Sequence, residues 1–120
     1  MNKKMFISSI IAVAILIGVS TSSAIDIIND DNYDFIIITT EKFSNNLQSF
    51  RDHKEQLGIT TKIVTLDDIY GGTFFEVKGR DDQEKIKFFI KDALETWGIT
   101  YILFVGNYKQ IPVRYCYNND

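Results

Sequence analysis

The sequence predicts an α/β fold: half of a doubly wound, mainly parallel sheet, in which the three strands lie in the spatial order 2-1-3. Two predicted strands, residues 33–39 and 100–105, are continuously apolar over residues 35–38 and 101–105, which is typical of parallel strands buried on both faces. Two stretches with apolar residues at helical spacing, and one further strand, complete a strand-helix-strand-helix-strand order. Right-handed crossovers would place the helices on the sheet.

The first strand, residues 33–39, leads into a helix predicted over residues 40–57. Thr40 would cap this helix, Glu41 lies in its first turn, and Gly58 occupies the place of a left-handed C-terminal cap. Lys54 interrupts the apolar stripe, and its methylene stem can pack while its amine reaches solvent. The stripe itself consists of Phe43, Leu47, Phe50 and Leu57.

The second strand is predicted over residues 60–66, where apolar and polar residues mix as they do at a sheet edge. A brief turn over residues 67–70 follows, Gly71 and Gly72 end it, and residues 73–80 form a loop. The second helix is predicted to open at Asp81, with Glu84 completing a capping box. Gly98 closes that helix. Its apolar stripe consists of Ile86, Phe89, Ile90, Ala93, Leu94 and Trp97.

The third strand is predicted over residues 100–105, followed by a loop over residues 107–112 and the start of an extended segment at residues 113–117. This strand is too apolar to be a comfortable exposed edge, and doubly wound sheets usually have five or more strands. We therefore expect more sheet to follow Asp120, so that the domain over residues 33–120 is incomplete. The alternative is a swapped or paired dimer that covers the same edge.

The amino terminus has the pattern of an export signal. Lys3 and Lys4 precede an apolar stretch over residues 5–19, and the small residues Ser22 and Ala24 stand where a signal peptidase reads. We predict a signal peptide over residues 1–24, and a secreted or cell-surface protein; an uncleaved membrane anchor is the alternative. Residues 25–32 are a short lead-in, and 96 residues remain after cleavage, enough for one modest core.

Charge and cysteine content narrow the classes of partner. Loss of Lys3 and Lys4 shifts the formal net charge from -3 to -5, and no basic stripe remains, so nucleic acid is not an expected partner. Cys116 is the only cysteine, which leaves no intramolecular disulfide even in an oxidising compartment.

The strand ends lack the motifs of common cofactor sites. A dinucleotide site needs a glycine-rich turn after the first strand, and none is present. A flavin phosphate loop needs several hydroxyls together with a glycine, and residues 39–43 contain no glycine. A phospho-receiver needs an acidic residue after the third strand, where Gly106 and Asn107 stand. We predict no cofactor.

The remaining candidate site residues have plain structural interpretations. His53 and Cys116 are the sole histidine and cysteine, but His53 lies in the middle of a helix, away from any strand end, and we do not predict a Cys-His dyad. We expect a partly packed histidine and a buried or semi-buried thiol. Asp67 and Asp68 supply the oxygen ligands that calcium prefers, yet a solvated turn is the favoured interpretation. We predict no catalytic, cofactor-binding or metal-binding residue in this chain.

The order and spacing of several short runs are similar to the gingipain family of secreted cysteine peptidases. The runs cover nearly all of residues 33–117. They are residues 33–39, His53-Lys54 with Gly58, residues 61–66 with Ile69, Ile86-Lys87 with Phe89-Ile90, residues 97–107, and Gln110-Ile111-Pro112.

The resemblance implies a caspase-like, Rossmann-like α/β domain that is exported and cleaves peptide bonds with a Cys-His dyad. In that family this stretch is the amino-terminal subdomain, and the catalytic histidine and cysteine come later. Neither His53 nor Cys116 matches those positions. The family usually has an aspartate where this chain has Asn107, while Lys54, Gly58, Gly106 and Pro112 match and are interpreted as structural.

Two hypotheses about function follow. The first is the non-catalytic amino-terminal subdomain of an exported gingipain-like cysteine endopeptidase, inactive alone and completed by the remainder of the peptidase domain, with a peptide substrate only in the full protein. The second is a non-enzymatic α/β module for binding or scaffolding that pairs with another chain through the open edge of its third strand.

Overall fold

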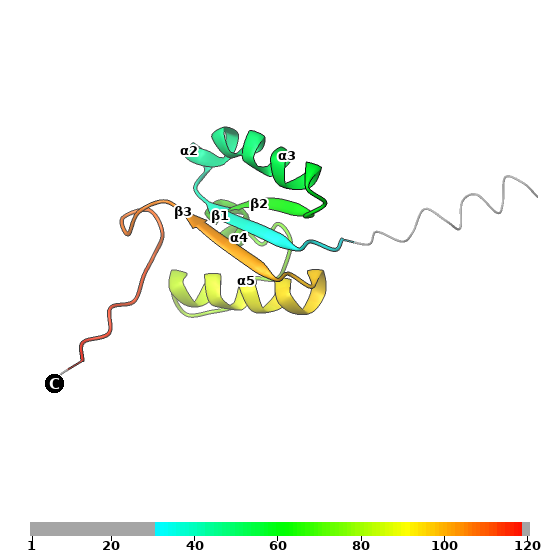
Figure 1. Cartoon of the computed structure of the whole chain (residues 1–120). Helices are drawn as coiled ribbons and strands as arrows, with labels where there is room; N and C mark the ends of the chain where they lie inside the picture. The colour runs from blue at the N-terminus through cyan, green and yellow to red at the C-terminus, as the bar shows by residue number, and fades with distance from the viewer. Residues whose placement is uncertain (1–30, 119–120) are drawn as a thin grey trace, which may run out of the picture. The chain divides into compact units, whose positions relative to one another are not determined.

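The computed structural model describes residues 31–118, and these form a three-stranded sheet with helices on both faces (Figure 1). The predicted signal peptide over residues 1–24 and residues 25–30 of the predicted lead-in lie outside the described residues. The elements in chain order are β1 (Phe35–Thr39), α2 (Glu41–Ser44), η1 (Asn45–Leu47), α3 (Gln48–Gln56), β2 (Thr61–Thr65), α4 (Leu66–Gly71), α5 (Asp82–Trp97) and β3 (Tyr101–Val105).

The strand order is β2-β1-β3 and both pairings are parallel, which confirms the predicted fold class. The register aligns Ile37 of β1 with Ile63 of β2 and with Leu103 of β3. Every residue of β1 is buried, as the unbroken apolar run predicts. No helix among residues 31–118 combines the length and apolarity that a membrane span requires.

The main core lies on the sheet face that carries α4 and α5. Because side chains alternate along a strand, Ile36 and Ile38 point to this face. They join Ile86, Phe89 and Trp97 of α5 in one cluster. Trp97 is its aromatic centre, with ring centroids 4.7 Å from Phe75, 5.2 Å from Tyr33 and 5.8 Å from Phe89.

The other face carries α2, η1 and α3, and it is less well covered. The prediction of one helix over residues 40–57 needs correction, because a 3₁₀ turn at Asn45–Leu47 separates α2 from α3. Side chains compete for backbone groups there: Ser44 donates to Glu41 O at 2.9 Å, and Gln48 donates to Ser44 O at 3.3 Å. Leu57 lies beyond α3 and is 60% exposed, and no residue of α3 is buried.

The predicted turn over residues 67–70 is instead the helix α4. Thr65 caps it: its hydroxyl accepts from Asp68 N at 3.1 Å, while the Asp68 carboxylate accepts from Thr65 N at 3.0 Å. This reciprocal capping box supplies the first turn with the hydrogen bonds that it would otherwise lack.

The helix α5 begins beside Asp81 as predicted, and Gly98 ends it in the left-handed conformation with φ +70°. Asp81 accepts from Glu84 N at 2.9 Å, but the expected return bond is absent. The Glu84 carboxylate instead binds Arg80, through the backbone N–H at 3.0 Å and the guanidinium at 2.6 Å. Leu94 of the predicted stripe is 57% exposed.

The chain leaves β3 along the amino-terminal end of α5. Ile111 is buried against Gly106, Gln83 donates to Val113 O at 3.4 Å, and Arg114 binds Asp81 at 2.6 Å. The extended start predicted at residues 113–117 forms no strand within the part of the chain that is described.

Candidate functional site

The carboxyl ends of the three strands are the usual ligand site of such a sheet, and here their polar side chains mostly bind their own chain. Thr39 donates its hydroxyl proton to Val105 O at 2.9 Å, which ties β1 to β3. The Asn107 carboxamide oxygen accepts from Lys109 N at 2.9 Å. Thr40 caps α2 by its backbone position alone, and within residues 31–118 its buried hydroxyl oxygen has no hydrogen-bond partner. These ends offer no phosphate loop.

The structure does not bring the sole histidine and the sole cysteine into a recognisable site. Contrary to the expected packing of both residues, His53 is exposed on α3, and Cys116 is exposed in the segment that follows β3. Asp68 belongs to the capping box of α4, and no group of three or more metal-ligating side chains is found among the described residues.

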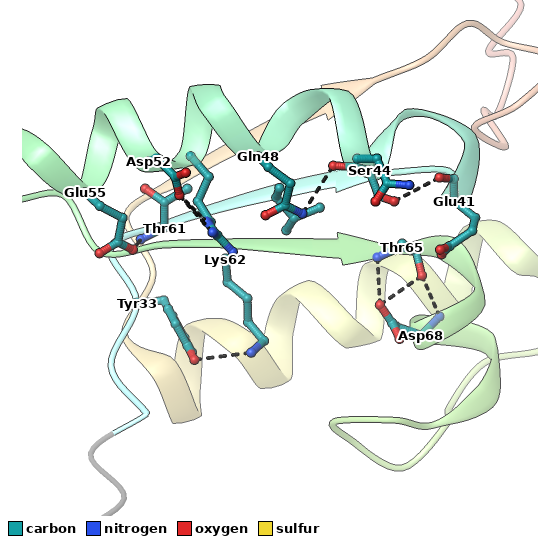
Figure 2. A pocket seen from close by; sticks show the side chains of 13 residues that line it. Tyr33, Glu41, Ser44, Gln48, Asp52, Glu55, Thr61, Lys62, Thr65 and Asp68 are labelled. Carbon is teal, nitrogen blue, oxygen red and sulfur yellow. Dashed lines mark hydrogen bonds and ion pairs between the residues drawn. The ribbon is translucent and has the colours of Figure 1, made fainter.

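A polar groove of about 820 Å³ lies between α2, α3 and β2 (Figure 2). Its charged side chains are largely engaged within the chain: Arg51 binds Asp52 at 2.8 Å, and Glu55 and Asp68 bind the backbone of β2. Lys62 points away beneath the sheet, where its amine donates to Tyr33 Oη at 3.2 Å and lies 4.5 Å from the Phe74 ring centroid.

The two edges of the sheet differ. Phe35 N donates to Thr60 O, so the parallel ladder turns the backbone groups of Thr61, Ile63 and Thr65 away from β1, toward the free edge of β2. Glu55 accepts from Thr61 N at 2.8 Å and Asp68 accepts from Thr65 N at 3.0 Å (Figure 2). Two of these three outward N–H groups are therefore satisfied by carboxylates of the chain itself, which protects the β2 edge.

Within residues 31–118, the β3 edge has no such protection. Tyr101 N donates to Asp34 O, so Ile102 and Phe104 direct their N–H and C=O groups away from β1. Apart from Val105, every residue of β3 is exposed, including Tyr101 at 61% and Phe104 at 46%. An exposed apolar strand with an unpaired edge is a template for another strand.

Apolar hollows flank β3 on both faces. One of about 440 Å³ lies on the α3 side and is lined by Phe35, Phe50, Lys54, Ile59, Tyr101, Ile102 and Leu103. The other, of about 310 Å³, lies on the α5 side near the end of β3 and is lined by Ile86, Phe104, Tyr108, Ile111 and Pro112. Together the bare edge and the two hollows form the candidate functional site, which we call the β3 interface.

The sequence predicted the exposed third strand but not the protection of the second. The hydrophobic periodicity of a sequence does not predict that the carboxylates of Glu55 and Asp68 bind backbone N–H groups of β2. The spacing of Thr65 and Asp68, which fits a capping box, was the one available signal.

Comparison with known proteins identifies the family of this chain. Residues 28–120 match the model of Peptidase family C25. Gingipain R2 of Porphyromonas gingivalis is 29% identical over 86 residues, which are 70% of this chain and 11% of that protein. Gingipain R1 of the same species is 30% identical over 81 residues, 66% of this chain and 7% of that protein. The chain thus spans only a small part of these relatives, and no solved structure gives a significant match. Matched over most of its length and built on the sheet described above, the chain belongs to Peptidase family C25, the gingipain family of cysteine peptidases.

Proposed function

We propose that this chain is the non-catalytic amino-terminal subdomain of an exported, gingipain-like cysteine endopeptidase. The observation that carries the proposal is the bare β3 edge of a chain that belongs to the C25 family and covers 11% of gingipain R2. In this proposal the remainder of the peptidase domain adds its strands to β3 and fills the two hollows beside it.

The chemistry of peptide cleavage would come from that remainder. A thiolate would attack the scissile carbonyl, and a histidine would assist the proton transfer. His53 and Cys116 are both exposed, on α3 and in the segment after β3, and neither is assigned a part in this chemistry.

Peptidase assays on matched polypeptides test whether the catalytic residues lie outside this chain. The 120-residue chain and a polypeptide in which it continues into the rest of a C25 domain would be compared on the same fluorogenic peptides. We expect turnover only from the longer polypeptide. Turnover by the 120-residue chain that is lost in both His53→Ala and Cys116→Ala would overturn the proposal, because it would place a dyad in this chain.

Export is the second part of the proposal, and it rests on the pattern of residues 1–24. Expression in a bacterial host that exports proteins should yield an extracytoplasmic product whose amino-terminal residue is Ile25. A product that keeps Met1 and stays with the membrane would instead favour an uncleaved anchor. Replacing Ala24 with a bulky residue is the matched control and should block processing.

The exposed β3 edge also favours a second candidate function, a non-enzymatic module that pairs with another chain. If the chain is such a module, the longer polypeptide that contains it should show no peptidase activity. The assay on the longer polypeptide separates the two candidates.

A further inference from the structure

The β3 strand is self-complementary. Residues 96–108 contain no charged side chain, so no like charges of the strand itself oppose the pairing of two copies of β3; Lys54 of α3 lines the hollow beside it. Ile102 and Phe104 both direct backbone groups to the open edge. In an antiparallel pair centred on Leu103, Ile102 of one copy faces Phe104 of the other. Each such pair exchanges two hydrogen bonds, so one register satisfies all four outward groups of each strand.

The side chains agree with this register on both faces. Tyr101 would face Val105 of the second copy on the α3 side, where Leu103 meets its own equivalent. On the α5 side Ile102 would face Phe104. All five residues are apolar or aromatic, and the hollows beside them offer space for the side chains of the other copy.

The protected β2 edge limits how far association can go. Glu55 and Asp68 already occupy the outward N–H groups of Thr61 and Thr65, at 2.8 Å and 3.0 Å. With one open edge per chain, pairing closes after two copies, whereas two open edges would allow open-ended growth.

We propose that the 120-residue chain forms a two-fold symmetric dimer through antiparallel pairing of β3 with β3 of a second copy, centred on Leu103. The product is a six-stranded sheet in the order 2-1-3-3-1-2. The second copy would bind the same β3 edge that the remainder of the peptidase domain covers in the proposed function. Only one of these two partners can pair with the edge at a time. Its test below does not depend on peptidase activity in any longer polypeptide.

Site-directed cross-linking tests the register. In the full chain with Cys116→Ser, the variant Leu103→Cys places two cysteines opposite each other in a non-hydrogen-bonded pair. Their Cα atoms are then about 4.5 Å apart, within the range of a disulfide. With oxidised glutathione as the oxidant, we expect most of this variant to migrate as a covalent dimer.

Tyr101→Cys with Cys116→Ser is the matched control, on the same strand and face and at a more exposed position. Its two cysteines would be about 13 Å apart along the strands, so we expect little cross-linking. Combining Tyr101→Cys with Val105→Cys should restore cross-linking, because these two positions face each other in the proposed register. This double variant tests the same register if Leu103→Cys fails to fold. Fluorescence of Trp97, the sole tryptophan, reports folding of each variant.

Two outcomes would overturn the inference. One is a folded Leu103→Cys variant that stays monomeric under oxidation. The other is equal cross-linking of the Leu103→Cys and Tyr101→Cys variants, which would indicate random collision rather than the two-fold register.

Discussion

The carboxylate of Glu55 accepts a 2.8 Å hydrogen bond from the backbone N–H of Thr61, on the outer edge of β2. This hydrogen bond joins α3 to β2. It also satisfies an N–H group that could otherwise donate to another strand. No equivalent contact protects Ile102 or Phe104 on β3 among the described residues. Within the described residues the β2 edge is therefore partly protected, whereas the β3 edge is open.

Removing the protection of β2 should change the stoichiometry of association. In the double variant Glu55→Ala with Asp68→Ala, the N–H groups of Thr61 and Thr65 lose their partners and the second edge opens. We expect species larger than a dimer in light scattering. Asp52→Ala, which changes a carboxylate of the same groove that binds Arg51, should leave the mass unchanged. Equal masses for all three proteins would show that the carboxylates do not control the edge.

Truncating a buried side chain of α5 should lower the free energy of unfolding far more than truncating an exposed side chain of the same helix. Phe89 is 5% exposed and packs against Phe75 and Trp97, so Phe89→Ala should lower the free energy of unfolding by about 3–5 kcal/mol. Leu94→Ala, on the same helix but exposed, should change it by less than about 0.5 kcal/mol. Urea unfolding followed by Trp97 fluorescence measures both; similar losses would contradict the described packing.

The cap of α5 should contribute measurably to stability. Asp81 accepts from Glu84 N at 2.9 Å and binds Arg114 at 2.6 Å, so Asp81→Ala removes both a cap and an anchor of the segment after β3. The expected loss in free energy of unfolding is about 1 kcal/mol. Asp82→Ala, next along the chain with an exposed bridge to Lys85, is the control and should lose less. A larger loss in free energy of unfolding for Asp82→Ala than for Asp81→Ala would mean that Asp81 is not the cap.

The carboxylate of Glu84 should make stability depend on pH in the acid range. Hydrogen bonds from Arg80 lower its pKa from 4.5 to about 2 in the folded chain. Above pH 4.5 the folded and unfolded states are both ionised, and the stabilisation is complete. As the pH falls from 4.5 toward 2, the unfolded state takes up the proton first, so the stabilisation is lost.

Urea midpoints of the wild type and of Glu84→Gln at several pH values check this. The difference between them should be largest above pH 4.5 and should shrink toward pH 2. Added salt should reduce it, because the ion pair is solvent-accessible. A difference that stays constant with pH would contradict the assigned pKa.

The order of the elements could be predicted because each strand or helix carries its own signal. The apolar run of β1 and the stripe of α5, with Gly98 at its end, report burial and periodicity directly. The 3₁₀ turn at Asn45–Leu47 could not be predicted in this way, because it depends on hydrogen bonds of Ser44 and Gln48 to individual carbonyls. α4 was missed for a related reason: its six residues are too few to show a period.

The candidate site was predictable only in part. The edge position of β3 follows from the predicted strand order 2-1-3, and its apolar sequence predicts that another strand covers that edge. The closure of β2 does not, because Glu55 and Thr61 belong to different elements, and only the folded arrangement brings the carboxylate to the N–H group. Likewise, Glu84 has the spacing of a capping-box partner for Asp81, yet the competing Arg80 guanidinium and N–H capture its carboxylate.

The molar mass of the 120-residue chain in solution shows whether the β3 edge is open and the β2 edge protected. Multi-angle light scattering would compare the wild type with Phe104→Lys on β3 and Ile63→Lys on β2, each shown to be folded by Trp97 fluorescence. We expect twice the chain mass of 13.8 kDa for the wild type and for Ile63→Lys, and a single chain mass for Phe104→Lys. The same mass for all three proteins, or a loss of association in Ile63→Lys alone, would show that the β3 edge does not mediate pairing.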